Sequence, residues 1–426
     1  MIGKTLVAVA TVGLVATPLS AQEPRTVTLD ETIALAMTYS PTMEQARGNI
    51  TNASWGKRTA IGNWLPSLSL SSGVSTNSSS QFDPTTQRTV SGSSTSYSAQ
   101  LNMGIDIFDG FRRIAQGNSA SADAASAEAG LINSEFQTAL QAKQAYFAAL
   151  ASDELLRVSE TRLRRAEEQL QISRDKLANG TAIRSDTLGS VVELGTSQLQ
   201  LLQARTALAT SEATLAATIG VLGSVSAFRD TLLLRPVRLD TGELRTTVLL
   251  ESPAIVQADA VTRSAQANLS VARAQYFPTV GASFTNSWSG RNVSALNGSW
   301  SLRLSASWQI FNGFTREANA ARNSVSLDVS RAQAEDTKRR VNANLTQAFA
   351  SLAAAEARHL IAVATIAAAE EQLRIEQERY RLGATTIVEV LTIQGNLEQA
   401  QVDRIQALFD FLVAKAEIES LVGREL

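Results

Sequence analysis

Few side chains in this 426-residue sequence have the types and spacing that catalysis requires. With one histidine, His359, and no cysteine, the chain has no thiol nucleophile and too few ligands for a multi-histidine metal site. Ser173 and Lys176 have the S-x-x-K spacing of an acylating serine, but they lie in a heptad-patterned helix without a K-T-G companion. The sequence therefore predicts no enzyme, no cofactor and no metal site.

Two carboxylates hold the most informative positions. Asp186 follows Gly180 by six residues and Glu389 follows Gly383 by six residues, so each lies just inside a predicted helix. A carboxylate stabilises the first turn of a helix, and this alone explains both residues. Several copies of the chain would also gather them into a ring that favours cations. The two interpretations are compatible.

The matching positions of these carboxylates belong to an internal repeat. The motifs around Ser40-Pro41 and Leu65-Pro66 return at a spacing of 212 residues, as Ser252-Pro253 and Phe277-Pro278. Further along, Phe108-Asp109-Gly110-Phe111 returns as Phe311-Asn312-Gly313-Phe314 at a spacing of 203. A nine-residue insertion in the Ser/Thr-rich stretch 76–95 explains the change. The chain is therefore predicted to be a tandem repeat of helix, β-hairpin, long helix and return helix.

The expected boundaries follow from this repeat. Residues 1–21 have the charged start, short apolar core and small-residue end of a secretory signal peptide. The first repeat spans 22–222, with strands at about 67–77 and 96–108, a long helix at about 112–179 and a return helix at about 185–220. After a connector, 223–252, the second repeat spans 253–426, with strands at about 279–288 and 299–311, a long helix at about 315–382 and a return helix at about 387–421.

All four strands alternate between an apolar and a polar face over about ten residues. Aromatic residues collect at the strand ends, as in outer-membrane β-barrels, although a half-buried soluble sheet would show the same alternation. Asp106 and Arg303 fall on the polar face and are predicted to line a lumen. Because an open sheet edge is not tolerated in lipid, other copies must close the barrel. Two copies would give eight strands and three would give twelve.

The helices are too long for a globular domain. The proline-free stretches from residues 112 and 315 each predict a helix of about 100 Å, with heptad seams typical of coiled coils. The return helix of the first repeat carries Leu188, Val192, Leu199 and Leu202, which are expected to pack on the long helix. The formal net charge of -2 argues against nucleic acid as a partner.

This arrangement resembles the TolC-like outer-membrane efflux family over essentially the whole mature chain. The most specific motif is Tyr380-Arg381-Leu382-Gly383 followed by Ile387-Val388-Glu389-Val390-Leu391. The resemblance implies a homotrimer in the Gram-negative outer membrane, with a twelve-stranded β-barrel continuous with a periplasmic α-helical coiled-coil barrel. It also implies two protein partners: a periplasmic adaptor, and an inner-membrane pump of the RND or ABC type.

The resemblance also implies roles for individual residues. The periplasmic aperture would comprise Asp186, Glu389, Tyr380, Thr385 and Thr392. Thr385 and Thr392 replace an arginine and an acidic residue of the family pattern, so the closed state is expected to be held differently. The adaptor would contact the hairpin ends, which are Gly180, Thr181, Ala182 and Ile183, and Gly383, Ala384, Thr385 and Thr386.

The predicted function is a passive outer-membrane exit duct of a tripartite efflux or type I secretion system. Drugs, metals and polypeptides all remain open as substrates, because a wide duct needs no selective pocket. The alternative is a non-channel, coiled-coil surface or adhesion protein whose sheet packs on itself.

Overall fold

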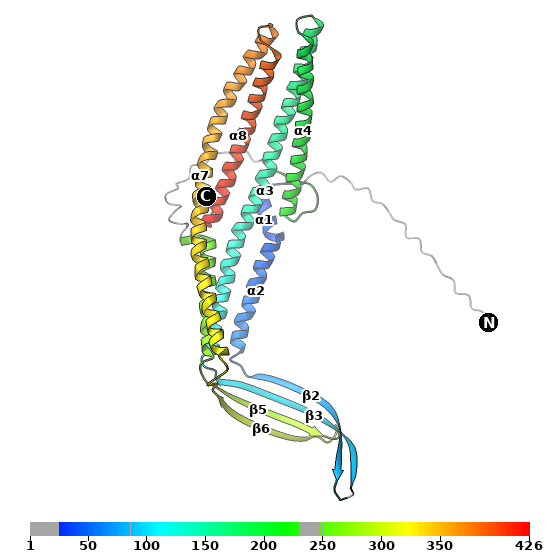
Figure 1. Ribbon diagram of the computed structural model, residues 1–426, viewed down its shortest axis with the longest axis vertical. Coiled ribbons are helices and arrows are strands. Elements are labelled where there is room, and N and C mark those ends of the chain that lie inside the picture. Colours follow the sequence, from blue (N-terminus) through cyan, green and yellow to red (C-terminus); the bar gives the residue numbers. More distant parts are fainter. Residues whose placement is uncertain (1–24, 86, 230–247, 249) are drawn as a thin grey trace, which may run out of the picture. The chain divides into compact units, whose positions relative to one another are not determined.

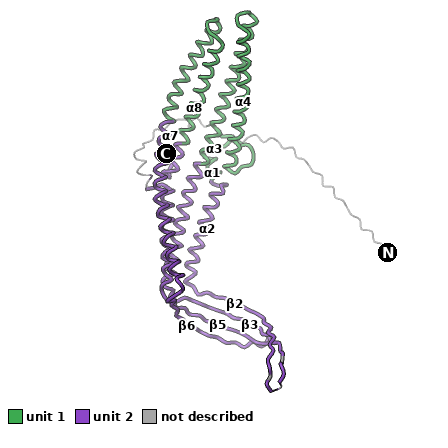
Figure 2. The backbone as a smooth tube through the Cα atoms, viewed as in Figure 1, with its two compact units in different colours: residues 1–36, 141–236, 355–413 green, residues 37–140, 237–354, 414–426 purple. Residues whose placement is uncertain are grey.

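The computed structural model describes residues 25–85, 87–229, 248 and 250–426. The chain divides into two compact units, each built from segments that are distant in the sequence (Figure 2). Unit 1 draws on Met1–Ala36, Gln141–Pro236 and Ala355–Val413, and unit 2 draws on Met37–Leu140, Val237–Ala354 and Ala414–Leu426. The predicted signal peptide lies outside the described residues, as does the short strand expected around residues 232–236 of the connector.

Unit 2 contains a four-stranded antiparallel sheet (Figure 1). The first repeat supplies the hairpin of β2 (Ser67–Asp83) and β3 (Arg88–Phe108), and the second supplies the hairpin of β5 (Thr279–Gly290) and β6 (Asn297–Ser307). The order β2-β3-β5-β6 joins the hairpins through β3 and β5. Strands β2 and β6 are therefore the two edges of the sheet.

The strand register places side chains of one kind on each face. One row across the sheet reads Ser67, Gly104, Ser283 and Arg303, and the next reads Leu68, Met103, Phe284 and Leu302. Directly opposed residues point to the same face, so the two rows lie on opposite faces. The apolar row is open to its surroundings, with Leu68 69% and Leu302 70% exposed. Each chain thus presents an apolar sheet face with nothing packed on these leucines.

The first hairpin is longer than the sequence predicted. Instead of ending near 77 and restarting near 96, its strands continue to Asp83 and resume at Arg88. The Ser/Thr-rich stretch, expected to be an insertion between strands, forms a regular ladder. Hydroxyl groups bond across it, with 2.8 Å between the Oγ atoms of Ser80 and Ser91. Such cross-strand hydroxyl pairs favour the extended conformation.

The last strand also differs from its expected bounds, because β6 ends at Ser307 rather than near residue 311. Beyond Ser307, the guanidinium group of Arg316 donates to the carbonyl oxygens of Gln309 (3.1 Å) and Ile310 (3.5 Å). The indole N–H of Trp308 donates to the Tyr276 carbonyl oxygen at 3.2 Å. These contacts with side chains replace the ladder bonds that would have continued the strand.

Helices accompany the sheet in unit 2. They include α2 (Pro41–Gly62), α6 (Pro253–Ala274) and the first parts of α3 (Arg112–Ala178) and α7 (Thr315–Arg381). Polar side chains join α3 to α6, for example Ser119 to Asn268 at 2.7 Å and Asn133 to Gln257 at 2.8 Å. Proline at the first position of α2 and of α6 suits the start of a helix.

The strand-to-helix junction of the first repeat is built around a buried ion pair. The Asp109 carboxylate accepts the Arg113 backbone N–H at 2.9 Å and lies 3.3 Å from Nε of the Arg113 guanidinium. That guanidinium also lies 4.5 Å from the ring centroid of Trp64. Gly110 has a left-handed φ of 70°, and a Cβ there would lie 2.6 Å from Cβ of Phe277. Only glycine fits this position.

The strand-to-helix junction of the second repeat makes the same contacts, with Asn312 in the place of Asp109. Asn312 accepts the Arg316 backbone N–H at 3.4 Å, and the Arg316 guanidinium lies 4.3 Å from the Tyr276 ring centroid. Gly313 and Phe314 again take left-handed φ values, 65° and 63°. The repeat therefore extends to backbone conformation and to the cation–π contact.

Unit 1 contains the far ends of α3 and α7 together with α4 (Arg184–Thr218) and most of α8 (Ile387–Val422). Strand β1 (Arg25–Val27) pairs in parallel with β4 (Val225–Ala227), which lies in the connector between the repeats. Helix α1 (Leu29–Tyr39) follows β1. The buried Tyr146 hydroxyl donates to the Phe228 carbonyl oxygen at 2.5 Å and fixes the start of the connector against α3.

The junction ion pair predicts unequal losses of stability in the two repeats. Asp109→Ala leaves the buried Arg113 charge without its partner and should cost about 3–5 kcal/mol of unfolding free energy. Asn312→Ala removes a neutral helix cap and should cost about 1 kcal/mol. Thermal unfolding of the detergent-solubilised protein, followed by circular dichroism, compares them. Equal losses in the two variants would contradict the assigned role of the ion pair.

Candidate functional site

The two helical hairpins of unit 1 end in turns of the same design. Helix α3 ends at Ala178 and α4 begins at Arg184, and α7 ends at Arg381 and α8 begins at Ile387. Gly180 and Gly383 adopt left-handed φ values of 71° and 78°, which only glycine takes without strain. The next residues, Thr181 and Ala384, donate backbone N–H groups to carbonyls of the preceding helix at 2.8 Å. These bonds close each helix with a Schellman-type cap.

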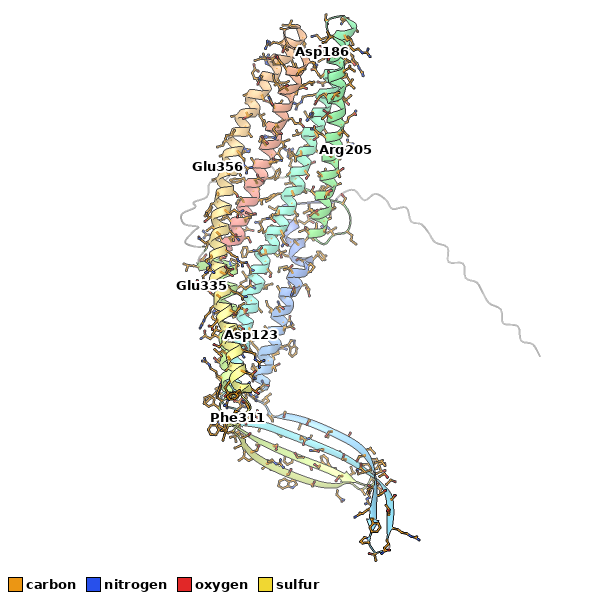
Figure 3. The ribbon with its side chains drawn as sticks, viewed as in Figure 1. Asp123, Asp186, Arg205, Phe311, Glu335 and Glu356 are labelled. Atoms are coloured by element: carbon orange, nitrogen blue, oxygen red, sulfur yellow. The ribbon has the colours of Figure 1, made fainter. Side chains whose placement is uncertain are left out.

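The predicted carboxylates occupy equivalent places in the first turns of the return helices. Asp186 lies at the end of the α3–α4 hairpin and is half-buried (Figure 3). Glu389 is exposed, and its carboxylate accepts the Thr385 hydroxyl at 2.6 Å. Thr385 therefore orients Glu389. Thr392 is exposed and donates to the Val388 carbonyl of its own helix at 2.8 Å.

Tyr380 is the buried member of the predicted aperture set. It is 3% exposed and packs in an apolar cluster with Leu373, Ile387, Val390 and Leu397, which holds α7 against α8. Its phenolic oxygen is buried without a hydrogen-bond partner among the described residues. The Tyr380 side chain is thus part of the hairpin core rather than of an open surface.

A lysine from the other hairpin contacts this tyrosine. Lys176 of α3 donates a hydrogen bond from Nζ to the Tyr380 carbonyl oxygen, and Nζ lies 4.0 Å from the centroid of the Tyr380 ring. A cation over an aromatic face is worth about 0.5–2 kcal/mol, more when the pair is shielded from water. Lys176 therefore supplies a cation near the hairpin ends, whereas Thr385, which replaces an arginine of the family pattern, carries no charge.

A second charged contact joins the hairpins farther from their ends. The Arg162 guanidinium of α3 forms ion pairs with Glu193 of α4 at 2.9 Å and with Glu398 of α8. Burial by itself would lower the pKa of Arg162, but hydrogen bonds and charge from Glu398 and Glu193 outweigh it and raise the pKa. Neighbouring Arg165 has a lowered pKa because burial dominates there. Arg162 thus stays charged and bridges three helices.

The helix seams of the two hairpins differ in chemistry. Small polar residues fill the seam between α3 and α4, where Ser173 and Ser190 are fully buried and their hydroxyl oxygens lie 2.8 Å apart. The seam between α7 and α8 is the apolar cluster around Tyr380. Ser173 and Lys176 thus make separate packing contacts, which accounts for the S-x-x-K spacing without catalysis.

The serine-lined seam also overturns one prediction. Leu188, Val192, Leu199 and Leu202 were expected to pack on the long helix, yet they are 56%, 69%, 64% and 62% exposed. Helix α4 turns its serine face toward α3, because small side chains allow the two helices to approach closely. The leucine and valine stripe is left on the outside.

The predicted lumen residues belong to unit 2, whereas the predicted aperture residues belong to unit 1. Asp106 opposes Gly281 of β5, and Arg303 opposes Ser283 of the same strand. Gly281 and Ser283 are two positions apart, so Asp106 and Arg303 lie on the same polar face. Asp106 pairs with Arg112 at 3.4 Å, whereas Arg303 is exposed. The sequence-based predictions missed the pairs Arg162–Glu398 and Lys176–Tyr380. The two residues of each pair are more than 200 positions apart, so no short-range pattern could reveal them.

Comparison with known proteins gives consistent matches. The family model described as outer membrane efflux protein matches residues 32–221 and 244–424. The outer membrane efflux protein BepC of Brucella suis biovar 1 (strain 1330) is 24% identical over 322 residues, which cover 75% of this chain and 70% of the relative.

Solved channel structures share the fold. The outer membrane protein VceC of Vibrio cholerae aligns with a TM-score of 0.80 and 18% identity, covering 93% of this chain and 96% of that one. The CmeC outer membrane channel of Campylobacter jejuni aligns with a TM-score of 0.81 and 14% identity, covering 99% and 94%. These matches confirm the predicted tandem-repeat channel fold. Together with the family match they support an outer-membrane efflux channel over the non-channel coiled-coil alternative.

The Lys176 contact predicts a local change in hairpin stability. Lys176→Met should speed hydrogen exchange of backbone amides in residues 376–390 about fivefold, because both the cation–π contact and the bond to the Tyr380 carbonyl are lost. Arg174→Met is the matched control, since it removes the same charge from an exposed position two residues away. Hydrogen–deuterium exchange with mass spectrometry measures both variants. Unchanged exchange in Lys176→Met would contradict the contact.

Proposed function

Because the chain belongs to the outer membrane efflux protein family, we propose that it is the passive exit duct of a tripartite efflux or type I secretion system. The channel acts in the outer membrane. In this proposal a periplasmic adaptor protein and an inner-membrane pump of the RND or ABC type deliver the substrate and supply the energy. Residues 22–222 and 253–426 are the two repeats, and each contributes one hairpin to the barrel.

The observation that carries the proposal is the two-faced sheet with unpaired edges. A strand edge in lipid leaves N–H and C=O groups unsatisfied at a cost of several kcal/mol each. Copies of the chain can satisfy both edges by pairing β6 of one copy with β2 of the next. Three copies close a twelve-stranded barrel that has its apolar face in lipid and its serine-rich face around a water-filled lumen.

Exposed apolar stripes on the helices support the same assembly. Besides the stripe on α4, exposed apolar residues recur every seven positions along α7 at Ile361, Ala368 and Ile375, and exposed Leu382 follows at the same spacing just beyond the helix. An apolar cavity of about 670 Å³, lined by Ala145, Ala148, Leu202 and Thr206 among others, continues the α4 stripe. Heptad stripes of this kind pack on neighbouring helices.

The apolar stretch of α7 has a second possible interpretation. Part of α7 has the length and mean hydropathy, 1.4, of a membrane span, and 22% of this window is buried. The exposed heptad favours helix packing between copies, with the sheet as the part that spans the membrane.

At the hairpin ends, three copies would bring together six carboxylates from Asp186 and Glu389. We assign these residues, with Tyr380, Thr385 and Thr392, to the periplasmic aperture. The Lys176 contact and the Arg162 ion pairs hold the two hairpins of each copy together and so favour a narrow aperture. The exposed turns 180–183 and 383–386, which include Ile183 at 67% exposure, would be the contact with the adaptor.

The aperture assignment predicts the ion selectivity of the pore. Asp186→Asn combined with Glu389→Gln should lower the preference for K⁺ over Cl⁻, because the ring of negative charge is removed. Reversal potentials in planar bilayers under a KCl gradient measure this preference. Asp328→Asn combined with Glu335→Gln is the control, which removes the same charge from exposed positions on α7 in unit 2. If both pairs change selectivity equally, the aperture assignment is wrong.

A further inference from the structure

The polar face of the sheet carries one cation, Arg303, that no described residue neutralises. In the four strands of this sheet the charged residues are Asp106, Arg303 and, at the hairpin end, Asp83 and Arg88. Arg303 is exposed, and the described residues offer it no ion pair or side-chain hydrogen bond. By register it opposes Ser283 of β5, and Gly104 and Ser67 complete the row. Its row therefore holds only small side chains.

The other charges near this face cancel one another. Asp106 pairs with Arg112 at 3.4 Å, and Asp109 pairs with Arg113 at 3.3 Å. Each acid thus has its own arginine, and Arg303 is the surplus charge. A neighbouring copy adds no acid along its β2 edge, because β2 contains no charged residue from Ser67 to Phe82. Arg303 remains unpaired even where the two edges meet.

A polar hollow lies beside this arginine. Its volume is about 640 Å³, and its lining includes Ser67, Gly104, Asp106, Arg112, Ser283 and Ser305. Gly104 and Gly281 contribute no side chain to this lining. Ser305 is two residues from Arg303 on the same strand and therefore shares its face. Hydroxyl donors and a free guanidinium thus converge on one region of the sheet.

We propose that Arg303 and the adjoining hollow form a binding station for anionic groups of solutes, such as carboxylate, sulfate or phosphate. The guanidinium offers paired N–H donors that match the oxygens of these groups, and the serine hydroxyls can complete their hydrogen bonding. The proposal rests on the proposed barrel, in which the polar face lines the lumen. Three copies then place three such stations around the conduction path.

The station has the opposite sign to the aperture. Carboxylates at the hairpin ends repel anions, whereas Arg303 attracts them within the barrel. A fixed charge on the wall of a lumen raises the local concentration of ions of the opposite sign. An anionic solute should therefore bind more readily when it enters from the extracellular side, where it meets Arg303 without passing the carboxylates.

The test uses the full chain in planar lipid bilayers, with citrate as the anionic probe. Citrate added on the extracellular side should block K⁺ current, and Arg303→Gln should raise the half-blocking concentration about tenfold, the effect of one charge-assisted contact. Arg303→Lys should retain most of the block. Arg291→Gln, which removes an exposed arginine from the loop between β5 and β6, is the matched control. Its half-blocking citrate concentration should equal that of the parent protein.

The outcomes separate the station from the duct itself. Pores that form normally but show the same citrate block in Arg303→Gln as in the parent protein would overturn the station. Equal weakening in Arg291→Gln would also overturn it, because the effect would then be a general surface charge. Failure of the parent protein to form any pore would instead overturn the proposed function. Asp106→Asn removes an acid from the lining of the hollow, while Arg112 keeps Asp109 at 3.8 Å, so this change should strengthen the block. A weaker block would count against the station.

Discussion

The need to satisfy backbone hydrogen bonds in lipid is the constraint on which the rest of this structure depends. A four-stranded sheet with an apolar face can enter a bilayer only if both edge strands find partners. The described residues supply no such partner for β2 or β6, and in the proposed assembly the partner is another copy. The serine-rich opposite face then has to surround water, since its hydroxyl groups would be costly to bury unpaired in an apolar layer. The unpaired edges and the two faces of the sheet are therefore enough to support the proposed duct, without any argument from the helices.

The helices also need partners, but for a different reason. In water it is the packing of their apolar side chains, rather than backbone hydrogen bonding, that limits which arrangements are stable. Within each hairpin the seam is already filled, by serines between α3 and α4 and by the Tyr380 cluster between α7 and α8. The remaining apolar stripes have no partner in the described chain. Contacts between the hairpins combine apolar packing of Ile172 of α3 on the Tyr380 cluster with charged contacts through Arg162 and Lys176. Charged contacts cost more to form and depend on geometry, so they suit a place where two elements must hold one arrangement.

The sequence predicted much of this arrangement because its signals are local or periodic. Alternation revealed the two sheet faces, glycines and acids marked the hairpin ends, and spacings of 203 and 212 residues revealed the repeat. The sequence-based predictions failed where tertiary contacts determine the strand bounds and the buried helix face. The Ser/Thr-rich stretch 76–95 has turn-like composition but pairs as strands because hydroxyls match across the ladder. The exposed face of α4 was misassigned because its serines, rather than its leucines, allow close approach to α3. Lys176 and Tyr380 are joined only by the fold.

Cross-linking across the proposed seam between copies tests the central claim most directly. The chain has no cysteine, so Ser71→Cys in β2 can be combined in turn with Ser299→Cys, Ser301→Cys or Ser305→Cys in β6. Within one chain β2 and β6 are three strand spacings apart, roughly 14 Å, too far for a disulfide. Oxidation in detergent should therefore link only different copies, and one combination should give a covalent ladder that stops at the trimer. Monomers in every combination, or a ladder that continues past the trimer, would contradict a closed barrel of three copies.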